Sequence, residues 1–454
     1  MQAELSRFLS DRPGLRFIDL VLHDINGVDR GKRIDVAGSA AVFERGLMLP
    51  GSLFALDVRG GTVQETGLGF DEGDADRPCR PLPGTLFDVP WLDHQVAQAQ
   101  LTMHEPDGSP FFADPRHQLA TVLAQLDALG LTPTIAVELE FYLLDLERDA
   151  QGMPQPPRGP LTGRREFRTQ INSMSDLDEY SALLADIDTV CHAQAVPATT
   201  ALAEYGPGQF EVNLAHGPDT LAACDQAVRF RRIVRSVARR HGCDATFMAK
   251  PYRDMAGSGL HVHVSLLDRE GRNVFADPRP EGSDALRQAI AGCLATMADG
   301  MAVFAPHANS WRRFRPDAYV PVTADWSINN RGTALRVPIS DAANRRLEHR
   351  VAGADANVYL VVAWILAGVL RGLQAARQPP APLTGNAYHG QTRTAELLPL
   401  HWPVAVERFA ASGAAAEIFG ARFRDLYATV KRAELSDFAS FVTPVECDWY
   451  LPAL

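Results

Sequence analysis

Ionisable side chains alternate with apolar ones in four short segments of this chain, at residues 135–143, 211–214, 261–266 and 346–351. Such alternation is typical of a strand with one apolar and one polar face. The polar positions in and near these segments are Glu138, Glu140, Glu204, Glu211, His261, His263, Ser265, Arg346, Glu348 and Arg350. One such strand fits a solvated outer surface equally well, but four of them favour one antiparallel sheet whose polar face lines a cleft.

The side chains on these polar faces are those that bind hard divalent cations and anions. Five glutamates and a histidine, with no cysteine nearby, favour Mg²⁺ or Mn²⁺ over Zn²⁺. The arginines among them favour phosphate or carboxylate groups as substrates. Together these residues predict phosphoryl-transfer chemistry. A zinc hydrolase built on His261 and His263 is an alternative, but it leaves the glutamate pairs unexplained.

The composition indicates an ordinary globular protein of the cytoplasm. The chain of 454 residues has 44 Lys and Arg against 55 Asp and Glu, and its net charge of −11 argues against nucleic acid or an anionic membrane as a partner. Its six cysteines form no CxxC pair and are expected to be reduced core thiols. No basic-then-apolar leader opens the chain. The apolar run at 358–370 is shorter than the ~20 residues of a membrane span and predicts a buried helix.

The polar strands are expected to lie in the second of two domains. Residues 15–35 predict a hairpin around Asn26-Gly27, and the Gly- and Pro-rich stretch that follows contains one short helix, at about 40–45. The segment from Gly27 to Lys32 resembles a phosphate loop, but it has three residues between its glycines in place of four and fits a hairpin turn better. We predict a small β-rich domain at 1–109 and a large domain at 110–454.

The large domain begins with a clear helix signal. Asp114 is a typical N-cap, Pro115 suits the first helical position, and Gly130 follows the last apolar residue. A strand at 134–144 comes next, and helix and strand signals then alternate to the end of the chain, with a further helix at 219–241. Surface loops are predicted at 151–163 and 378–385.

Short motifs in a fixed order make the chain resemble the glutamine synthetase superfamily over nearly its full length. The motifs are NG at 26–27, RGK at 30–32, VELE at 137–140, EYGPGQFE at 204–211, FMAKP at 247–251, GSGLHVH at 257–263, NSWRR at 309–313, NR at 330–331 with Arg336, and RLEHR at 346–350. The resemblance implies an α+β fold, with an N-terminal β-grasp domain and a large catalytic domain built on a curved antiparallel sheet. Residues 136–145 and 350–357 are similar to the bacterial γ-glutamylpolyamine synthetases, typified by glutamate–putrescine ligase.

The resemblance also implies a role for each motif residue. One metal site would use Glu140, Glu204 and Glu211, and a second would use Glu138, His261 and Glu348, with two to three Mg²⁺ or Mn²⁺ ions in each active site. ATP, the co-substrate, would contact His263, Ser265, Arg336 and Arg346, and glutamate would contact Gly257, Arg313 and Arg350. Arg331 would neutralise the transferring phosphoryl group, with Glu211 and Arg313 as further catalytic residues. Glutamate would thus form γ-glutamyl phosphate, from which a nitrogen nucleophile displaces phosphate.

Two departures from the family pattern concern the nitrogen donor. Glutamine synthetases place ammonium-binding acids at the positions that are Pro50 and Tyr319 here, so ammonia is disfavoured. We predict that Tyr319 and Trp326 line a slot for an alkylamine, the alternative being that they only pack the flap around residue 319. Asp57 and Glu65 are predicted to recognise the amine, which arrives protonated.

The predicted function is therefore ATP-dependent ligation of glutamate to a primary amine, putrescine or another polyamine, in polyamine breakdown. The alternatives are a ligase for a monoamine such as ethanolamine or isopropylamine, authentic glutamine synthetase, an inactive synthetase-like structural protein, and a metal-dependent hydrolase. The presence of all six predicted metal ligands disfavours the inactive protein. The resemblance implies a dodecamer of two hexameric rings, with active sites shared between neighbouring subunits. Tyr388 lies near a tyrosine that some bacterial family members adenylylate, but its flanking sequence differs and we predict no regulatory role for it.

Overall fold

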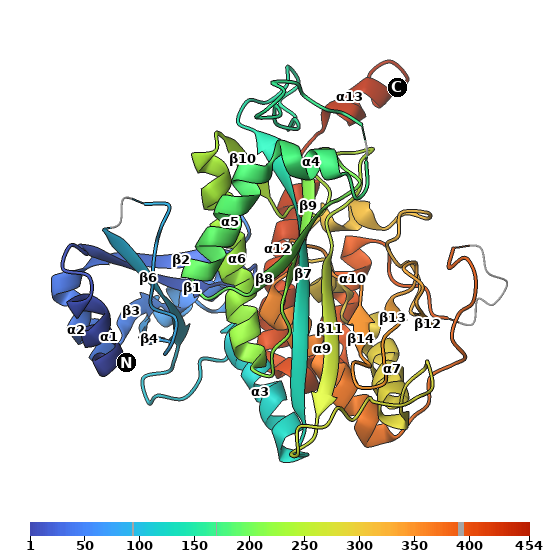
Figure 1. Cartoon of the computed structure of the whole chain (residues 1–454), viewed down its shortest axis with the longest axis horizontal. Helices are drawn as coiled ribbons and strands as arrows, with labels where there is room; N and C mark the ends of the chain where they lie inside the picture. The colour runs from blue at the N-terminus through green and yellow to red at the C-terminus, as the bar shows by residue number, and fades with distance from the viewer. Residues whose placement is uncertain (93–94, 169, 389–394) are drawn as a thin grey trace.

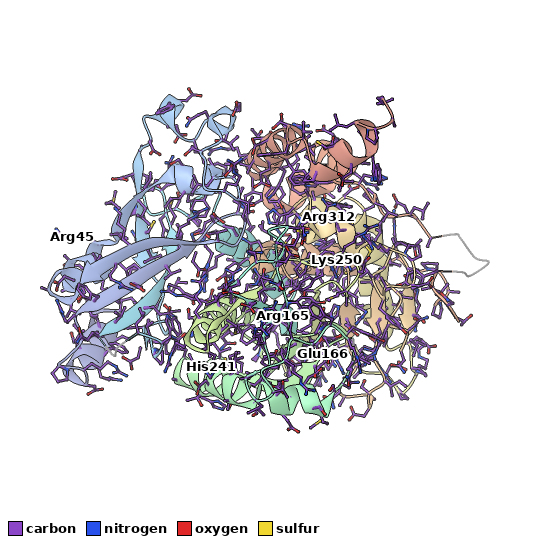
Figure 2. The ribbon with its side chains drawn as sticks, turned by 90° about the horizontal axis from the view of Figure 1, so that it is seen from above. Arg45, Arg165, Glu166, His241, Lys250 and Arg312 are labelled. Carbon is purple, nitrogen blue, oxygen red and sulfur yellow. The ribbon has the colours of Figure 1, made fainter. Side chains whose placement is uncertain are left out.

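The computed structural model describes residues 1–92, 95–168, 170–388 and 395–454. Two β-sheets organise these residues, one in the N-terminal part of the chain and a larger one in the rest (Figure 1). Seen from above, Arg45 marks the outer end of the N-terminal unit, whereas Lys250 and Arg312 lie near the centre of the molecule (Figure 2). The combination of an N-terminal β unit with a separate sheet and many helices confirms the predicted α+β class.

The N-terminal sheet has six strands. They are β1 (Phe17–His23), β2 (Asp29–Asp35), β3 (Leu47–Pro50), β4 (Asp76–Pro81), β5 (Phe87–Asp88) and β6 (Val96–Met103). Their order is β2-β1-β6-β4-β3, with β5 also paired to β6, and only β1 and β6 are parallel. Two helices, α1 (Gln2–Ser10) and α2 (Val36–Arg45), contact each other beside it. The sequence analysis missed α1, and it placed the start of α2 too late because Asp35 caps that helix by accepting from the N–H of Ala37.

The predicted hairpin at Asn26-Gly27 is confirmed. β1 and β2 pair antiparallel from Phe17 opposite Asp35 to His23 opposite Asp29. The Asp24 carboxylate accepts from the N–H groups of Asn26 and Val28, at 2.9 Å each. Gly27 has a φ of +73°, a left-handed conformation that glycine adopts without strain. The segment is therefore a hairpin turn and not a phosphate loop.

The second sheet has eight strands and contains the four that alternation predicted. The strands are β7 (Thr132–Asp145), β8 (Ala198–Ala203), β9 (Gln209–Leu214), β10 (Cys243–Thr246), β11 (Leu260–Leu267), β12 (Trp326–Ile328), β13 (Leu335–Val337) and β14 (Leu347–His349). Their order is β12-β13-β14-β11-β7-β9-β8, with β10 paired to β7. The predicted strands β14, β11, β7 and β9 are neighbours and antiparallel, as expected. The sheet departs from the expected antiparallel pattern only where β12 and β13 pair in parallel.

The larger unit also contains helices, most of which have buried apolar residues. They are α3 (Pro115–Ala128), α4 (Met174–Glu179), α5 (Ser181–Ala193), α6 (Thr220–Arg240), α7 (Asp284–Met297), α8 (Met301–Phe304), α9 (Val358–Ala375), α10 (Trp402–Ala411), α11 (Gly413–Phe419), α12 (Ala421–Ala439) and α13 (Pro444–Tyr450). The predicted N-cap of α3 is confirmed, since Asp114 accepts from the N–H of Arg116. Asp219, predicted as the first residue of a helix, is the N-cap of α6 and accepts from the N–H of Ala222. On the back of β7, Phe141 contacts Phe230 of α6, with ring centroids 6.3 Å apart.

The apolar run at 358–370 lies in α9. By length and composition alone this helix is long and apolar enough to cross a membrane, but 78% of its apolar window is buried inside the protein. It contacts α3, α6 and α7. The prediction of a buried core helix is confirmed.

Three further predictions have mixed outcomes. Alternation of helix and strand to the end of the chain is wrong, because the described residues after β14 form helices and no further strand of either sheet. All six thiols are free, but Cys447 on α13 is only half-buried and does not lie in the core. The chain passes from one sheet to the other between β6 and β7, and the division into 1–109 and 110–454 stays a proposal.

Candidate active site

The register of the large sheet places the predicted polar residues opposite one another. The cross-strand pairs are Glu138 with His261, Glu140 with Glu211, and His263 with Glu348. Residues directly opposite each other in an antiparallel pair share one face, and their side chains lie within contact range. The intervening residues Val137, Leu139 and Phe141 are buried on the other face. The predicted polar face therefore exists and is continuous across β9, β7, β11 and β14.

Three groups of side chains on this face are suited to hold a divalent cation. Within each group, one ligand atom per residue lies within 4.8 Å of the others; the groups are Glu140 with Glu204 and Glu211, Glu138 with Glu211 and His261, and Glu138 with His263 and Glu348. The first group is the predicted first metal site. Its members come from β7, from the turn before β9 and from β9 itself, so the site requires the strand pairing and not only the local sequence.

The two histidines belong to different groups, and neither group is the predicted second site of Glu138, His261 and Glu348. His261 Nδ1 lies 3.2 Å from Glu138 Oε2, and His263 Nε2 lies 2.8 Å from Glu138 Oε1. His263, predicted as a nucleotide contact, completes the group that contains Glu348, whereas His261 completes a group with Glu211. Glu138 thus contacts both the predicted metal ligand His261 and the predicted nucleotide contact His263.

Burial and mutual repulsion dominate the electrostatics of the first group. Burial raises the pKa of Glu140 and of Glu204. Burial and the carboxylates of Glu138, Glu140 and Glu204 together raise the pKa of Glu211 to about 9. A divalent cation would offset this repulsion, and the donors are carboxylate oxygens and imidazole nitrogens, which suit Mg²⁺ or Mn²⁺. The residues therefore fit the metal ions that the resemblance implies.

Glu348 is surrounded by cationic side chains, whereas the carboxylates of the first group lie next to one another. Arg336 donates to its Oε2 at 2.8 Å, and Arg350 donates to its Oε1. Burial raises the pKa of Glu348, but Arg350, the two histidines and Arg336 outweigh burial and lower it to about 2. These contacts favour the ionised form of Glu348 and hold two of the predicted cleft arginines in place.

The predicted glutamate-binding loop packs tightly against Arg313. A side chain at Gly257 would place its Cβ 2.6 Å from Arg313 Cγ, so only glycine fits this position. The guanidinium of Arg313 is buried and donates to the Val351 carbonyl at 3.2 Å, and burial lowers its pKa. Among the described residues its Nε finds no hydrogen-bond partner. An unpaired buried cationic donor of this kind is suited to an anionic substrate.

The predicted ATP contacts lie along two cavities. One, of about 750 Å³, is lined by Glu138, His263, Ser265 and Arg346. The other, of about 720 Å³, is lined by Arg331 and Arg336 together with residues 382–385. Arg346 Nε lies 3.2 Å from His263 Nδ1, and Arg350 Nε donates to the carbonyl of Arg331 at 3.2 Å. The cleft arginines are thus tied to the strands that carry the carboxylates.

The predicted amine-pocket residues of the large unit have different environments. Trp326 is 2% exposed, and its indole N–H donates to the Pro380 carbonyl at 2.7 Å, as expected of a residue that packs the structure. Tyr319 is 57% exposed and has a positive φ of +53°. Its ring stacks on Tyr205, which the sequence analysis did not single out although it directly follows Glu204.

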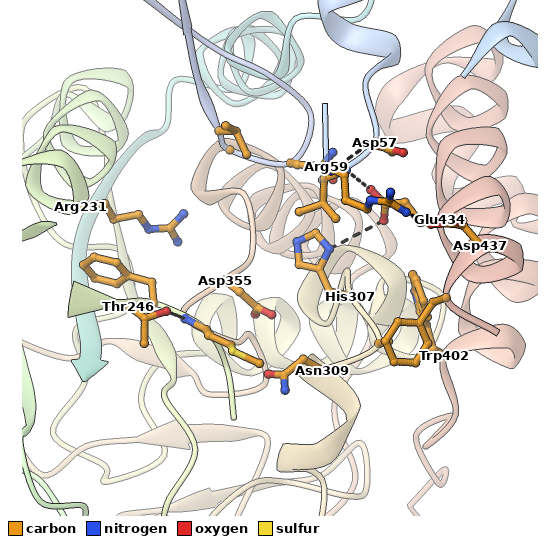
Figure 3. Close-up of a pocket in the computed structure, with 18 of the residues that line it drawn as sticks. Asp57, Arg59, Arg231, Thr246, His307, Asn309, Asp355, Trp402, Glu434 and Asp437 are labelled. Carbon is orange, nitrogen blue, oxygen red and sulfur yellow. Dashed lines mark hydrogen bonds and ion pairs between the residues drawn. The ribbon is translucent and has the colours of Figure 1, made fainter. Parts of the chain in front are cut away.

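The other three predicted amine residues lie in the N-terminal unit. Pro50 ends β3, and Glu65 is exposed in a short 3₁₀ helix, Gln64–Thr66. Asp57 accepts from the N–H groups of Arg59 and Gly61. It lines a cavity of about 450 Å³ between the N-terminal unit and α12, shown in Figure 3. None of the predicted metal ligands lines this cavity.

Comparison with known proteins agrees with this geometry. Residues 112–450 match the family model of the glutamine synthetase catalytic domain.

The chain belongs to the glutamine synthetase family.

Within this family, the chain is 42% identical to gamma-glutamylputrescine synthetase PuuA of Escherichia coli, over 99% of the chain and 94% of that protein. It is 31% identical to a glutamate–isopropylamine ligase of Pseudomonas sp., over 94% and 93% of the two chains. Among solved structures it resembles a GmaS/ADP complex with a TM-score of 0.86 and 28% identity, over 99% of both chains. The glutamine synthetase fold predicted for this family member is therefore confirmed.

Proposed function

We propose that this glutamine synthetase family member is an ATP-dependent ligase that joins the γ-carboxylate of glutamate to a primary amine, putrescine or another polyamine. One observation carries the proposal: the carboxylates and histidines of the predicted metal sites come together beside one sheet face. The resemblance adds that Pro50 and Tyr319 stand at the two positions of the ammonium-binding acids. The identity of 42% to a gamma-glutamylputrescine synthetase supports the diamine. We place the reaction at the start of polyamine breakdown in the cytoplasm.

In the first step, an oxygen of the glutamate γ-carboxylate attacks the γ-phosphorus of ATP. The bond from phosphorus to the β-phosphate oxygen breaks, giving γ-glutamyl phosphate and ADP. Both reactants are anions, so positive charge has to lie between them. In the proposal Arg313 and Arg350 hold the glutamate carboxylates, and Arg331 neutralises the transferring phosphoryl group. Two to three Mg²⁺ or Mn²⁺ ions in the carboxylate–histidine groups supply further positive charge when they are bound.

In the second step, the amine nitrogen attacks the acyl carbon and phosphate leaves. The amine has to lose a proton before it attacks, so a nearby carboxylate is required. We propose that Asp57 and Glu65 recognise the amine from the N-terminal unit of a neighbouring subunit. The cavity that Asp57 lines contains none of the predicted metal ligands, which supports a role toward a neighbouring subunit.

We propose that the protein assembles as a dodecamer of two hexameric rings. The C-terminal segment supports association, because large apolar side chains are exposed along it. They are Phe438, Phe441, Val442, Val445, Trp449, Tyr450, Leu451 and Leu454. Mass photometry that found only monomers would contradict the dodecamer and the shared active site together.

The test of the proposed function is phosphate release from Mg²⁺-ATP with glutamate and a series of amines. Ammonia, putrescine, spermidine, ethanolamine and isopropylamine are supplied in turn, and the product masses are measured. We expect turnover with putrescine or spermidine and little with ammonia. Preferred turnover of ethanolamine or isopropylamine would assign a monoamine ligase, and strong turnover of ammonia would assign a glutamine synthetase. Absence of turnover with every amine by an intact oligomer would contradict the proposal.

A further inference from the structure

Two exposed tyrosines, far apart in sequence, meet beside the carboxylate cluster. The ring centroids of Tyr205 and Tyr319 lie 6.3 Å apart with an interplanar angle of 22°, so the rings are stacked. The two residues are 37% and 57% exposed. A stacked pair of aromatic rings with open faces is suited to bind an alkyl chain or a cation.

Tyr205 connects this pair to the reacting end of the site. Its backbone N–H donates to Oε2 of Glu204 at 3.3 Å. Glu204 groups with Glu140 and Glu211 and also feels the positive charge of Arg331 and Arg350. The tyrosine pair therefore stands next to the place where the acyl phosphate and the attacking nitrogen have to meet.

Tyr319 is held in place at a cost in backbone energy. A φ of +53° is unfavourable for a bulky residue, and the exposed ring gains little burial in return. The flap is tied down at the next residue, since the hydroxyl of Tyr388 donates to the carbonyl of Val320 at 3.2 Å. Residue 387 packs in turn near Gly332, where an added Cβ would lie 3.0 Å from Ala387 Cβ. The flap that carries Tyr319 is thus linked to the segment that carries Arg331.

We propose that Tyr205 and Tyr319 form the specificity site for the distal, charged end of a diamine or polyamine. The inference rests on the proposed function. The reacting amino group would lie toward Glu204, the methylene chain would pack along the rings, and the distal ammonium would contact a ring face. The faces of both rings carry negative quadrupole charge, and the neighbouring carboxylates add to it, so a cation is favoured over a neutral methyl end. A monoamine of equal length would gain the apolar packing alone.

The test compares putrescine with n-butylamine, which has the same four-carbon chain and no distal ammonium. The measured quantity is the ratio of kcat/KM for the two amines, with saturating glutamate and Mg²⁺-ATP. Tyr205→Leu and Tyr319→Leu are each expected to lower this ratio about 3- to 30-fold, the range of a cation–π contact from an exposed to a desolvated setting. Tyr205→Phe, the matched control, retains the ring and is expected to keep the ratio within about twofold of wild type.

The outcomes separate this inference from the proposed function. If the wild type turns over neither of these amines nor spermidine, the proposed function fails, and the inference fails with it. If the wild type prefers putrescine but both leucine variants keep the wild-type ratio, the proposed function stands and the specificity site is wrong. A leucine variant that loses both amines equally would likewise overturn the inference, because a purely structural role lowers both values together. Loss of selectivity in Tyr205→Phe as large as in Tyr205→Leu would show that the hydroxyl, and not the ring face, matters.

Discussion

Replacement of Glu211 by glutamine is expected to stabilise the metal-free protein while it removes a metal ligand. Glu211 is 8% exposed, and its pKa rises to about 9 because of burial and the carboxylates around it. Because the pKa of Glu211 is raised in the folded state, the contribution of this carboxyl to folding stability is fully present below its unfolded pKa of 4.5. That contribution is lost as the pH rises toward 9. At pH 7 the carboxyl therefore destabilises the fold by about 3 kcal/mol. Glutamine removes this penalty, and its carbonyl oxygen can still accept from Asn213, as Glu211 does at 3.1 Å.

Thermal unfolding in EDTA between pH 5 and pH 8, at one protein concentration, measures the effect. Glu211→Gln is expected to melt above the wild type at pH 7 to 8 and close to it at pH 5. Added Mg²⁺ or Mn²⁺ should reverse the order, because an ion at a thousandfold excess over its Kd stabilises the wild type by about 4 kcal/mol. Activity should fall sharply in the same variant.

Glu138→Gln is the matched control with the opposite sign. Burial raises the pKa of Glu138, but its contacts with His261 and His263 outweigh burial and lower the pKa. A lowered pKa gives stability that is present above the unfolded value and lost as the pH falls, so Glu138→Gln should melt below the wild type at pH 7 without metal. The reasoning is refuted if Glu211→Gln melts below the wild type in EDTA at pH 7, or if its advantage is the same at pH 5 and pH 8.

Three other perturbations test neighbouring parts of the structure. Glu434→Gln removes the partner of the fully buried Lys431, 2.8 Å away, and should cost about 3–5 kcal/mol in denaturant unfolding at pH 7. Burial raises the pKa of Glu434, but Lys431 and His307 lower it to about 2. The stability lost in the variant should therefore shrink below pH 4.5. A stability loss that does not depend on pH would contradict the ion pair. Tyr388→Phe removes one hydrogen bond from the flap and should raise the amine KM about 2- to 10-fold, with a much smaller change in the ATP KM. Trp326→Phe should lower the melting temperature and keep the putrescine-to-butylamine ratio within about twofold, and a shifted ratio would place Trp326 in the amine slot after all.

Local patterns in the sequence were sufficient to predict the strands that carry the site residues. The alternation in β7, β9, β11 and β14 fixed which side chains face away from the core, because the two-residue period of a strand leaves no other arrangement. The cap Asp114 located the start of α3, since a cap depends only on residues within one turn. The ordered motifs indicated the glutamine synthetase family before any contact between the strands was known.

Tertiary structure decided which of these residues meet. Alternation gives the face of His261 and His263 but not the strand opposite each, and the register of β11 against β14 placed His263 with Glu348. An aromatic residue such as Trp326 suits both a ligand slot and a packed core, and its burial in the folded chain favours packing. The contact of Tyr205 with Tyr319 joins two segments whose separation in sequence leaves no local signal. Contacts of this kind depend on how the whole chain packs. A single sequence shows the local conformational preference of each residue but does not show which distant residue it contacts.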